Sequence, residues 1–518
     1  MDISRRWFIG GMTAFGAASF SRIIHAKSGV FSADTPEARI GMITDIHISL
    51  RRTKDEYCYE GVDVLRKTLE WFRDREVDGV AICGDIADYG LVEELEEFAR
   101  IWNSVFPGGK TLTGRKVERL FVCGNHDWIG YTYNGGKKLF GEKAVEHSLS
   151  KDGFAGWSKV FDEPFESIWR KEIKGYTFVG AHWIADKCRS REEKGVPQAA
   201  PWFAASASSI DSSKPFFYLQ HPLPKNTVNG SWAWGQDAGD VGAALEKMPN
   251  AIALSGHSHY SLSDERTIWQ GSYTSIGLAS LKYIAFGYGD VQDGGRENDR
   301  FGGSVGNRNY YKVMPNMSGR DGHHGILAHI YSDRIVYERR DFGDFSLLGD
   351  DWVMPLPAAE PMPFMLAKRI SESIAPEFRS GASLAIKIGK GKNRGGGKVK
   401  SVVQDVVKVK IPSADGRDGV MAFDYELIFK DSAGKSVRRF VFAEKWYRSL
   451  KIRSAVKLLE TIFSLKSIGL IGKIFVEVRP RNTLGKKGSA LFAEIEYMPP
   501  PTPAPSSVVM PQSPAATT

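Results

Sequence analysis

Five short apolar segments of the chain end in side chains that can bind a metal ion, and this recurrence limits the fold more than any other feature. Each segment is a predicted strand, because an apolar run is followed by turn-forming residues. The residues that follow are Thr44-Asp45-Ile46-His47, Gly84-Asp85-Ile86-Ala87-Asp88, Gly124-Asn125-His126-Asp127, Gln220-His221-Pro222 and Ser255-Gly256-His257-Ser258-His259. In parallel α/β sheets the carboxyl ends of strands gather at one edge, where ligands bind. The pattern therefore predicts an α/β fold with a polar pocket at that edge.

Turn chemistry is the competing interpretation for any one of these segments, since Asn, Asp and Gly are common where strands end. For the third segment, Gly124 is expected to free the backbone to turn. Turn chemistry does not explain the histidines, which turns do not favour. Carboxylate, imidazole and amide groups together suit a borderline-to-hard divalent metal ion.

The order of the remaining elements supports an α/β domain. Apolar residues recur at helical spacing over 59–75 and again around 91–102, between predicted strands, which is a βαβαβ arrangement. The predicted strands, in chain order, are 38–43, 80–83, 120–123, 176–181, 216–220, 251–254, 326–331 and 335–339. The last two are expected to form a closing hairpin.

In order, the five segments resemble the signature of the calcineurin-like metallophosphoesterases: D-x-H, G-D-x-x-D, G-N-H-D/E, a lone His and G-H-x-H. The resemblance extends over roughly residues 38–345. It implies an αββα sandwich that hydrolyses a phosphoester, either a monoester or a diester. It also implies two divalent or trivalent metal ions (Mn, Fe or Zn), about 3.5–4 Å apart, with a bridging hydroxide as the nucleophile.

The resemblance also assigns roles to individual residues. One metal would be bound by Asp45, His47, Asp85 and His259, and the second by Asp85, Asn125, His221 and His257, with Asp85 bridging. His126 resembles the general acid that protonates the leaving oxygen, and Asp88 resembles the residue that orients its imidazole. Two interpretations of Asp127 stay open: it orients ligands, or it caps the following turn.

Two departures from the signature argue against a serine/threonine protein phosphatase. Those enzymes continue the second block with Arg-Gly, where this chain has Tyr89-Gly90, and they have Glu where this chain has Asp127. The chain is more similar to the broad bacterial phosphoesterases and phosphodiesterases. Substrate, metal identity and oligomeric state do not follow from the sequence.

Three further features are candidates for contact with the substrate or the ligands. The loop 131–138 follows the third block, Trp232 and Trp234 follow His221, and His182 ends another predicted strand. The first two have an ordinary structural alternative: an exposed loop for 131–138, and packing for the tryptophans.

A Pro-rich stretch at 355–363 separates the α/β domain, assigned to 27–360, from a second domain, assigned to 374–498. The second domain is predicted to be mostly β, and it weakly resembles fibronectin type III-like or immunoglobulin-like sandwiches. A helix is expected at 455–464. The Pro-rich tail, 499–518, is expected to be disordered.

Charge differs sharply between the two domains. The chain carries a net charge of +8, yet the residues from 361 onward contain 27 Lys/Arg and 13 Asp/Glu, so the first 360 residues are net acidic. The basic stretch 387–410 is interpreted as a flexible solvated loop, or as an arm for an anionic partner such as an envelope component (a surface polysaccharide or lipid headgroups) or, as the less expected partner, nucleic acid. Docking on the acidic catalytic domain is a further alternative. A nuclease would need basic charge around the catalytic cleft, so nucleic acid is not an expected partner. The alternatives to an exported phosphoesterase are an envelope-binding protein and an exported nuclease or nucleotidase.

The first residues resemble a twin-arginine export signal. Ser4-Arg5-Arg6-Trp7-Phe8-Ile9 precedes a mildly apolar stretch, and cleavage is expected after Ala26. The signal peptide, 1–26, predicts a periplasmic or secreted protein. No later segment approaches ~20 uninterrupted apolar residues, so no membrane span is expected after processing.

The four cysteines, Cys58, Cys83, Cys123 and Cys188, form neither a disulfide framework nor zinc-site spacing. Cys83 and Cys123 are expected to be buried thiols, with a bridge between them as the alternative.

Overall fold

The computed structural model describes residues 35–499 apart from 55, 185–194, 212, 231–232, 249, 286–318, 359–361, 394–401 and 417–419. The predicted signal peptide, most of the Pro-rich tail, Trp232 and Cys188 lie outside the described residues. Export and tail disorder therefore stay predictions.

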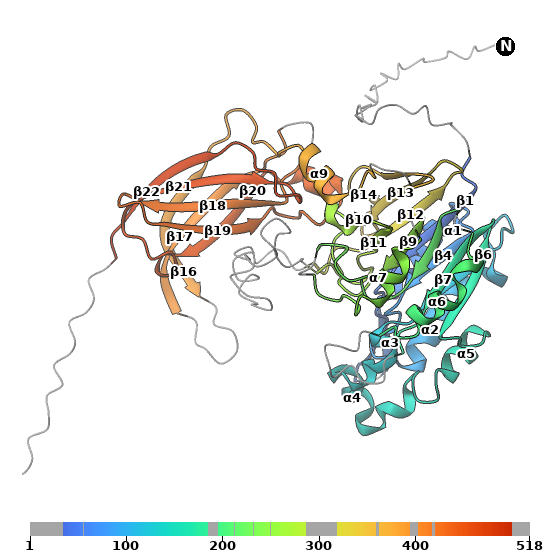
Figure 1. Ribbon diagram of the computed structural model, residues 1–518. Coiled ribbons are helices and arrows are strands. Elements are labelled where there is room, and N and C mark those ends of the chain that lie inside the picture. Colours follow the sequence, from blue (N-terminus) through green and yellow to red (C-terminus); the bar gives the residue numbers. More distant parts are fainter. Residues whose placement is uncertain are drawn as a thin grey trace, which may run out of the picture. The chain divides into compact units, whose positions relative to one another are not determined.

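The described residues between 36 and 355 fold around two facing sheets (Figure 1). The first sheet contains β1 (Ala38–Ile43), β4 (Gly79–Cys83), β5 (Glu118–Val122), β12 (His324–Ile330), β13 (Arg334–Asp341), β14 (Ser346–Leu347) and β15 (Trp352–Pro355). The second contains β6 (Ile168–Ile173), β7 (Tyr176–Ala181), β8 (Phe216–Leu219), β9 (Ala251–Ser255), β10 (Ile268–Gln270) and β11 (Thr274–Gly277). A small hairpin, β2 (Ser49–Arg52) with β3 (Tyr57–Glu60), follows β1.

Apolar side chains alternate between the two faces of each sheet, which produces four layers. Met42 of β1 and Leu254 of β9 belong to one core between the sheets. On the outer face of the first sheet, Ile82 packs with α1 (Val62–Arg73), α2 (Val92–Val105) and α5 (Ala155–Phe161). On the outer face of the second, Tyr218 packs with α6 (Ala199–Ser206) and α7 (Asp240–Leu245). The predicted αββα sandwich is confirmed.

Parallel pairing places the metal-ligating segments of each sheet at the carboxyl ends of its strands. β1, β4 and β5 are parallel, and so are β7, β8, β9 and β11. All eight predicted strands of this domain are present, with ends that differ by at most two residues. The first predicted helix is shorter than expected, because 57–60 pairs as strand β3 and α1 begins only at Val62.

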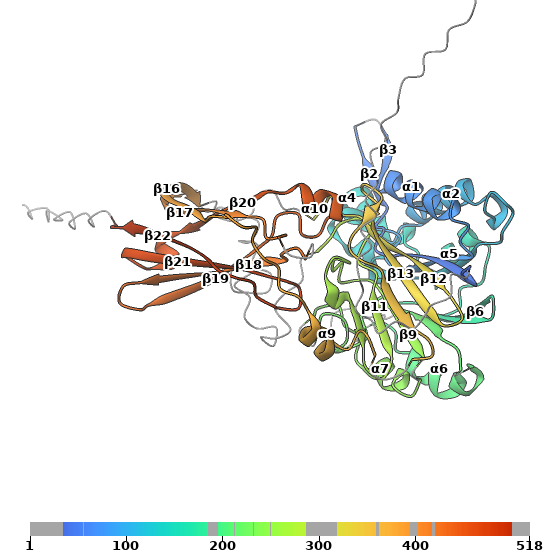
Figure 2. The ribbon, with the colours of Figure 1, turned by 90° about the horizontal axis from the view of Figure 1, so that it is seen from above.

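The C-terminal part is rich in strands, as predicted (Figure 2). One sheet contains β16 (Ala385–Asn393), β17 (Val402–Pro412) and β20 (Leu458–Ser464). The other contains β18 (Asp424–Asp431), β19 (Ser436–Phe442), β21 (Gly472–Arg481) and β22 (Leu491–Tyr497). Three short helices accompany them: α9 (Leu366–Glu372), α10 (Leu450–Ala455) and α11 (Leu465–Ile468). The fibronectin-like or immunoglobulin-like topology and the domain boundaries stay predictions.

The prediction of a helix at 455–464 is wrong. Residues 458–464 form β20, which pairs with β17, because Leu459, Thr461 and Phe463 alternate as buried residues along an extended chain. Helix α10 ends at Ala455, before this segment.

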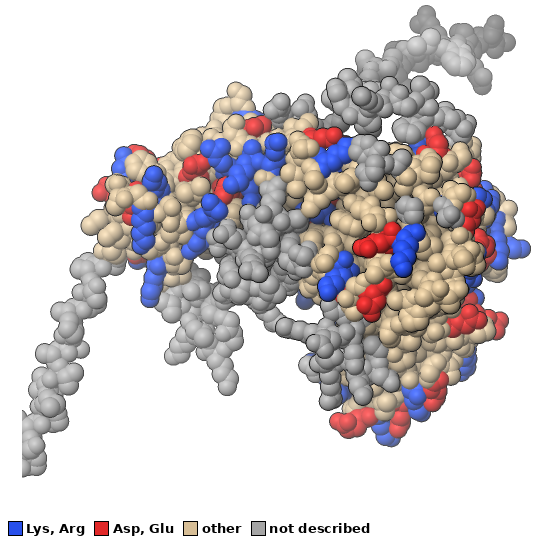
Figure 3. Space-filling model, in the orientation of Figure 1, with Lys and Arg blue, Asp and Glu red and all other residues tan. Residues whose placement is uncertain are grey.

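The interpretation of 387–410 as a loop is wrong for most of its length. Residues 385–393 and 402–412 pair as β16 and β17, and Lys387 lies directly opposite Lys408. Figure 3 shows Lys and Arg side chains gathered along this C-terminal part. An anionic partner for this surface stays a prediction.

No helix among the described residues is long and apolar enough to cross a membrane. Cys58, Cys83 and Cys123 are free thiols, and Cys83 and Cys123 are buried as expected. The alternative of a Cys83–Cys123 bridge is therefore not adopted in this structure.

Candidate metal centre

The seven residues that the sequence singles out as metal ligands come together at the carboxyl ends of the strands. These candidate ligands are Asp45, His47, Asp85, Asn125, His221, His257 and His259. They follow β1, β4, β5, β8 and β9, which belong to both sheets. Six of the seven are buried, and His257 is half-buried.

The ligand atoms form two groups, and the carboxylate of Asp85 faces both of them. Asp45, His47 and His259 offer atoms within 4.8 Å of one another, as do Asp85, His221 and His257. Asp85 Oδ2 lies 3.2 Å from His221 Nε2 and 3.7 Å from His47 Nε2, so it faces both groups. Asn125 Oδ1 lies 3.1 Å from His221 Nε2.

Three of the candidate ligands use one polar side-chain atom in a hydrogen bond to a neighbouring residue. The other polar atom of each side chain then faces the metal centre. His221 Nδ1 donates to the Cys83 carbonyl at 2.7 Å, and His259 Nδ1 donates to the Tyr283 carbonyl at 3.2 Å. Asn125 Nδ2 donates to the Tyr133 hydroxyl at 3.2 Å, which leaves Oδ1 facing His221. Partners of this kind fix the tautomer and orientation of metal ligands.

The spacing and chemistry of the atoms that face the centre match the coordination of a metal ion better than they match hydrogen bonds among these atoms. Asp45 Oδ2 accepts hydrogen bonds from Thr44 Oγ1 and His257 N, whereas Asp45 Oδ1 is buried and accepts none. His259 Nε2 lies 2.8 Å from that oxygen and 3.3 Å from His47 Nε2. Metal–nitrogen bonds of about 2.0–2.1 Å place neighbouring ligand atoms about 3.0–3.4 Å apart. This donor set is that of a cation site.

The backbone of the ligand segments adopts a conformation that side-chain-bearing residues rarely adopt. Five candidate ligands have φ between 47° and 67°: Asp45, His47, Asp85, His257 and His259. Left-handed backbone in residues other than glycine costs free energy and clusters at functional sites. The sharp turns at three strand ends aim these side chains at a common point.

Glycine is needed at Gly124 for a different reason from the expected one. Its φ is −106°, so the residue does not need glycine to turn. A Cβ there would lie 2.1 Å from Asp85 Oδ1, which means that glycine lets β5 approach the ligand on β4. Gly84, with φ of 95°, is the glycine that supplies a left-handed turn.

The structure places His126 beside the two groups and Asp88 between His126 and His47. The Asp88 main-chain carbonyl accepts a hydrogen bond from His126 Nδ1 at 2.7 Å, while the Asp88 carboxylate lies 3.5 Å from that nitrogen. The carboxylate is closer to His47 Nδ1, at 3.2 Å. Asp88 thus orients His126 through its backbone and His47 through its side chain. A His126 nitrogen also lies within 4.8 Å of ligand atoms of His47 and Asp85.

Asp127 binds backbone amides rather than other site side chains. Its carboxylate accepts hydrogen bonds from the N–H groups of Gly124 and Ala87, both at 2.8 Å, and of Ile86 at 3.3 Å. Burial, reinforced by the charge of Asp85, raises the pKa of Asp127 to about 7. Of the two open interpretations, the geometry favours the cap, which also joins the second and third ligand segments.

Replacing Asp127 with alanine is expected to destabilise the metal-free protein by about 3 kcal/mol or more, because up to three buried N–H groups lose their acceptor at about 1–3 kcal/mol each. Urea unfolding of the metal-free protein measures this free energy without a contribution from metal binding. Asp152→Ala, at an exposed position, is the matched control. An unchanged unfolding free energy combined with lost metal would instead make Asp127 a residue that orients ligands.

Ion pairing dominates the electrostatics of the site. Burial alone would raise the pKa of Asp45, but His259 and His47 hold it well below its usual value. Burial alone would lower the pKa of His47, but Asp45 and Asp88 raise it to about 10. Burial lowers the pKa of His126 and lowers that of His257 to about 3. The carboxylates Asp45 and Asp85 therefore stay ionised, and a bound cation would replace the imidazole protons as their counter-charge.

The three features that the sequence left open lie close to the ligands. Tyr133, in the loop expected at 131–138, has its ring centre 4.7 Å from that of His126 and immediately precedes helix α4 (Asn134–Phe140). Trp234 is 37% exposed, and its ring centre lies 4.9 Å from that of His257. His182 Nδ1 accepts a hydrogen bond from the Cys123 N–H at 3.0 Å, which ties the end of β7 to that of β5.

Sequence reasoning missed Tyr283, Lys282 and Trp183. The Tyr283 ring centre lies 4.3 Å from that of His259, and the Trp183 ring centre lies 5.9 Å from that of His257. Lys282 Nζ donates to the His47 carbonyl at 3.1 Å. Lys282 and Tyr283 belong to no strand-end motif, so the sequence carries no signal for them, whereas Trp183 directly follows His182 at the end of β7.

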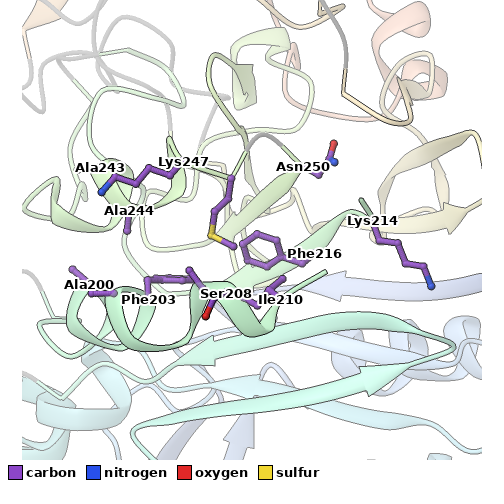
Figure 4. Close-up of a pocket in the computed structure, with 13 residues that line it drawn as sticks. Ala200, Phe203, Ser208, Ile210, Lys214, Phe216, Ala243, Ala244, Lys247 and Asn250 are labelled. Carbon is purple, nitrogen blue, oxygen red and sulfur yellow. The ribbon is translucent and has the colours of Figure 1, made fainter. Parts of the chain in front are cut away.

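A cleft of about 850 Å³ opens beside His47, Asp88 and His126. A second cavity, of about 530 Å³, lies between α6 and α7 and is lined mainly by apolar side chains such as Phe203 and Phe216 (Figure 4). No candidate ligand lines the second cavity. Of these two, the first cleft is the one lined by a candidate ligand, His47.

Residues 38–261 match the family model of the calcineurin-like phosphoesterases. No curated protein matches the chain. Among solved structures, a dimetal phosphatase from Danio rerio is 14% identical, with a TM-score of 0.35, and the match covers 61% of this chain and 98% of that one. A purple acid phosphatase from yellow lupin is also 14% identical, with a TM-score of 0.38, and the match covers 61% of this chain and 54% of that one. Because both TM-scores are low, the assignment of residues 38–261 to the calcineurin-like phosphoesterases rests on the family model.

Proposed function

Residues 38–261 form a calcineurin-like phosphoesterase domain, and on this premise we propose that the protein is a two-metal phosphoesterase that acts outside the cytoplasm. Hydrolysis of a phosphoester bond is the activity of the family. The observation that supports two metals is the pair of buried ligand groups with Asp85 facing both. The twin-arginine pattern at residues 4–9 supports export.

Asp45, His47, Asp85 and His259 would hold one ion, and Asp85, Asn125, His221 and His257 would hold the other. Two such ions act as Lewis acids on phosphoryl oxygens and make hydroxide available near neutral pH. Imidazole, carboxylate and amide ligands suit Mn, Fe or Zn.

His126 is the residue in position to handle the leaving group's proton. It lines the cleft, lies beside both ligand groups, and its Nδ1 is held by the Asp88 carbonyl, which leaves Nε2 for the substrate. Burial lowers its pKa in the free protein, but the negative charge of a bound phosphoryl group favours the protonated imidazole. In this proposal His126 gives that proton to the leaving oxygen.

Removal of metal is expected to abolish hydrolysis, and its return is expected to restore it. Mature protein is stripped with a chelator and assayed on p-nitrophenyl phosphate and bis(p-nitrophenyl) phosphate, before and after addition of Mn²⁺, Fe²⁺ or Zn²⁺. The relative rates on the two compounds also show whether monoesters or diesters are preferred. If no metal restores hydrolysis of any phosphoester tested, nucleotides included, the proposed function is wrong.

A further inference from the structure

The cleft beside the metal centre contains a half-buried lysine, Lys282, on its wall. The residues that line this cleft include His47, Asp88 and His126 of the candidate site and the consecutive residues Lys282 and Tyr283. At about 850 Å³ the cleft is in the size range of pockets that enclose whole small molecules, roughly 300–1,000 Å³. It therefore has room for a substantial leaving group in addition to the phosphoryl group.

The backbone of Lys282 is fixed to the strand end that carries the first ligand. Its N–H donates to the Asp45 carbonyl at 3.1 Å and to Ser280 Oγ at 3.0 Å. Ser280 Oγ in turn donates to the same Asp45 carbonyl at 3.0 Å. The Lys282 ammonium donates to the His47 carbonyl at 3.1 Å. The cation is therefore held at a set position beside the metal centre.

Lys282 forms no ion pair within the described part of the chain. Among the described residues no carboxylate lies within ion-pair distance of its Nζ, although the charges of Asp88, Glu60 and Glu94 act on it from farther away. Glu60, on the same cleft, is paired with Arg51 at 3.2 Å, and Asp63 and Arg320 lie exposed at the rim. Burial of an ammonium without a counter-charge costs free energy that a bound anion returns.

We propose that the leaving group of the substrate carries a second anionic group, a carboxylate or a phosphate, and that Lys282 binds it. This inference rests on the proposed phosphoesterase function. His126 and Lys282 line the same cleft, so in this proposal a leaving group that takes its proton from His126 occupies a cleft that also contains the ammonium. The ammonium selects for the second anion by charge and hydrogen bonding.

Aryl phosphates that differ in one group test the proposal. Phenyl phosphate is given a carboxylate, a second phosphate or a neutral carboxamide at the 3- or 4-position. For at least one isomer, kcat/KM of the wild-type, metal-loaded protein is expected to be higher with an anionic group than with the carboxamide. Lys282→Met is expected to reduce this preference roughly 10- to 100-fold, the effect of losing one charge-assisted hydrogen bond. The carboxylate and phosphate compounds show which anion the site prefers.

Two further variants separate a binding role from a structural one. Lys282→Arg keeps the positive charge and is expected to retain part of the preference. Lys67→Met removes an exposed lysine of α1, outside the cleft, and is expected to leave the preference unchanged. A lysine that only tethers the His47 loop would, when replaced, lower kcat/KM for charged and neutral compounds equally.

Binding measured without turnover keeps the inference separate from the proposed function. Calorimetry on metal-loaded protein compares non-hydrolysable 3- and 4-carboxyphenylphosphonate with their carboxamides. Tighter binding of the carboxylates in the wild type, lost in Lys282→Met, supports the inference even if no ester is hydrolysed; in that case the proposed function alone fails. Equal binding of charged and neutral compounds by the wild type, or an equal loss of both in Lys282→Met, overturns the inference.

Discussion

Asp85→Asn is expected to weaken metal binding at both sites and to abolish hydrolysis. Asp85 Oδ2 faces His221 of one ligand group and His47 of the other, so the substitution removes a negative charge from both. Loss of a partner behind a metal ligand already costs roughly 10–100-fold in affinity, and loss of a shared ligand charge should cost at least about 100-fold at each site. Asparagine keeps the shape of the side chain and an oxygen that can accept from the His126 N–H, as Asp85 Oδ1 does at 2.9 Å.

The metal content per chain after dialysis, measured by elemental analysis, checks this result. Calorimetric titration with Mn²⁺ or Zn²⁺ shows whether one or two binding events are weakened. Asp63→Asn, an exposed change at the rim of the cleft, is the matched control and should retain both metals. If Asp85→Asn retains one ion at wild-type affinity, Asp85 serves a single site and the bridging assignment is wrong.

His126→Ala is expected to lower kcat by about 10²–10⁴-fold, the usual contribution of a general acid, and to leave both metals bound. Its Nδ1 bonds the Asp88 carbonyl, and its position in the cleft faces the substrate. A general acid contributes most to kcat when the leaving group is a poor one. The loss should therefore be larger with alkyl phosphates than with p-nitrophenyl phosphate.

Kinetics on the two substrate types, together with metal analysis of the same samples, check the role of His126. His147→Ala is the matched control, because His147 is a partly exposed histidine that pairs with Glu93 and belongs to no candidate metal group. A His126 nitrogen lies within 4.8 Å of ligand atoms of His47 and Asp85, so the variant has an informative alternative outcome. If metal is lost along with turnover, His126 is a ligand rather than an acid.

Strand-end motifs were a reliable guide because parallel strands oblige their carboxyl ends to meet. Asp45 and Asp85 follow neighbouring strands of the first sheet, whose edge brings them together as predicted. His221 follows β8 of the second sheet, so the packing of the two sheets brings it to the same place. The sequence predicted the C-terminal strands less accurately. Residues 458–464 follow helix α10 and were expected to be helical, but pairing with β17 determines their conformation.

Short motifs at the strand ends were enough to predict the seven candidate ligands and the position of His126, and the resemblance of these motifs to a known family implied the αββα class of the N-terminal domain. Only the tertiary structure showed what surrounds these groups. Asp127 caps backbone amides of two segments, and the Asp88 carboxylate orients His47. Lys282 lies on the wall of the cleft. These roles depend on hydrogen bonds and burial between segments distant in the chain. No local pattern of residues encodes such contacts.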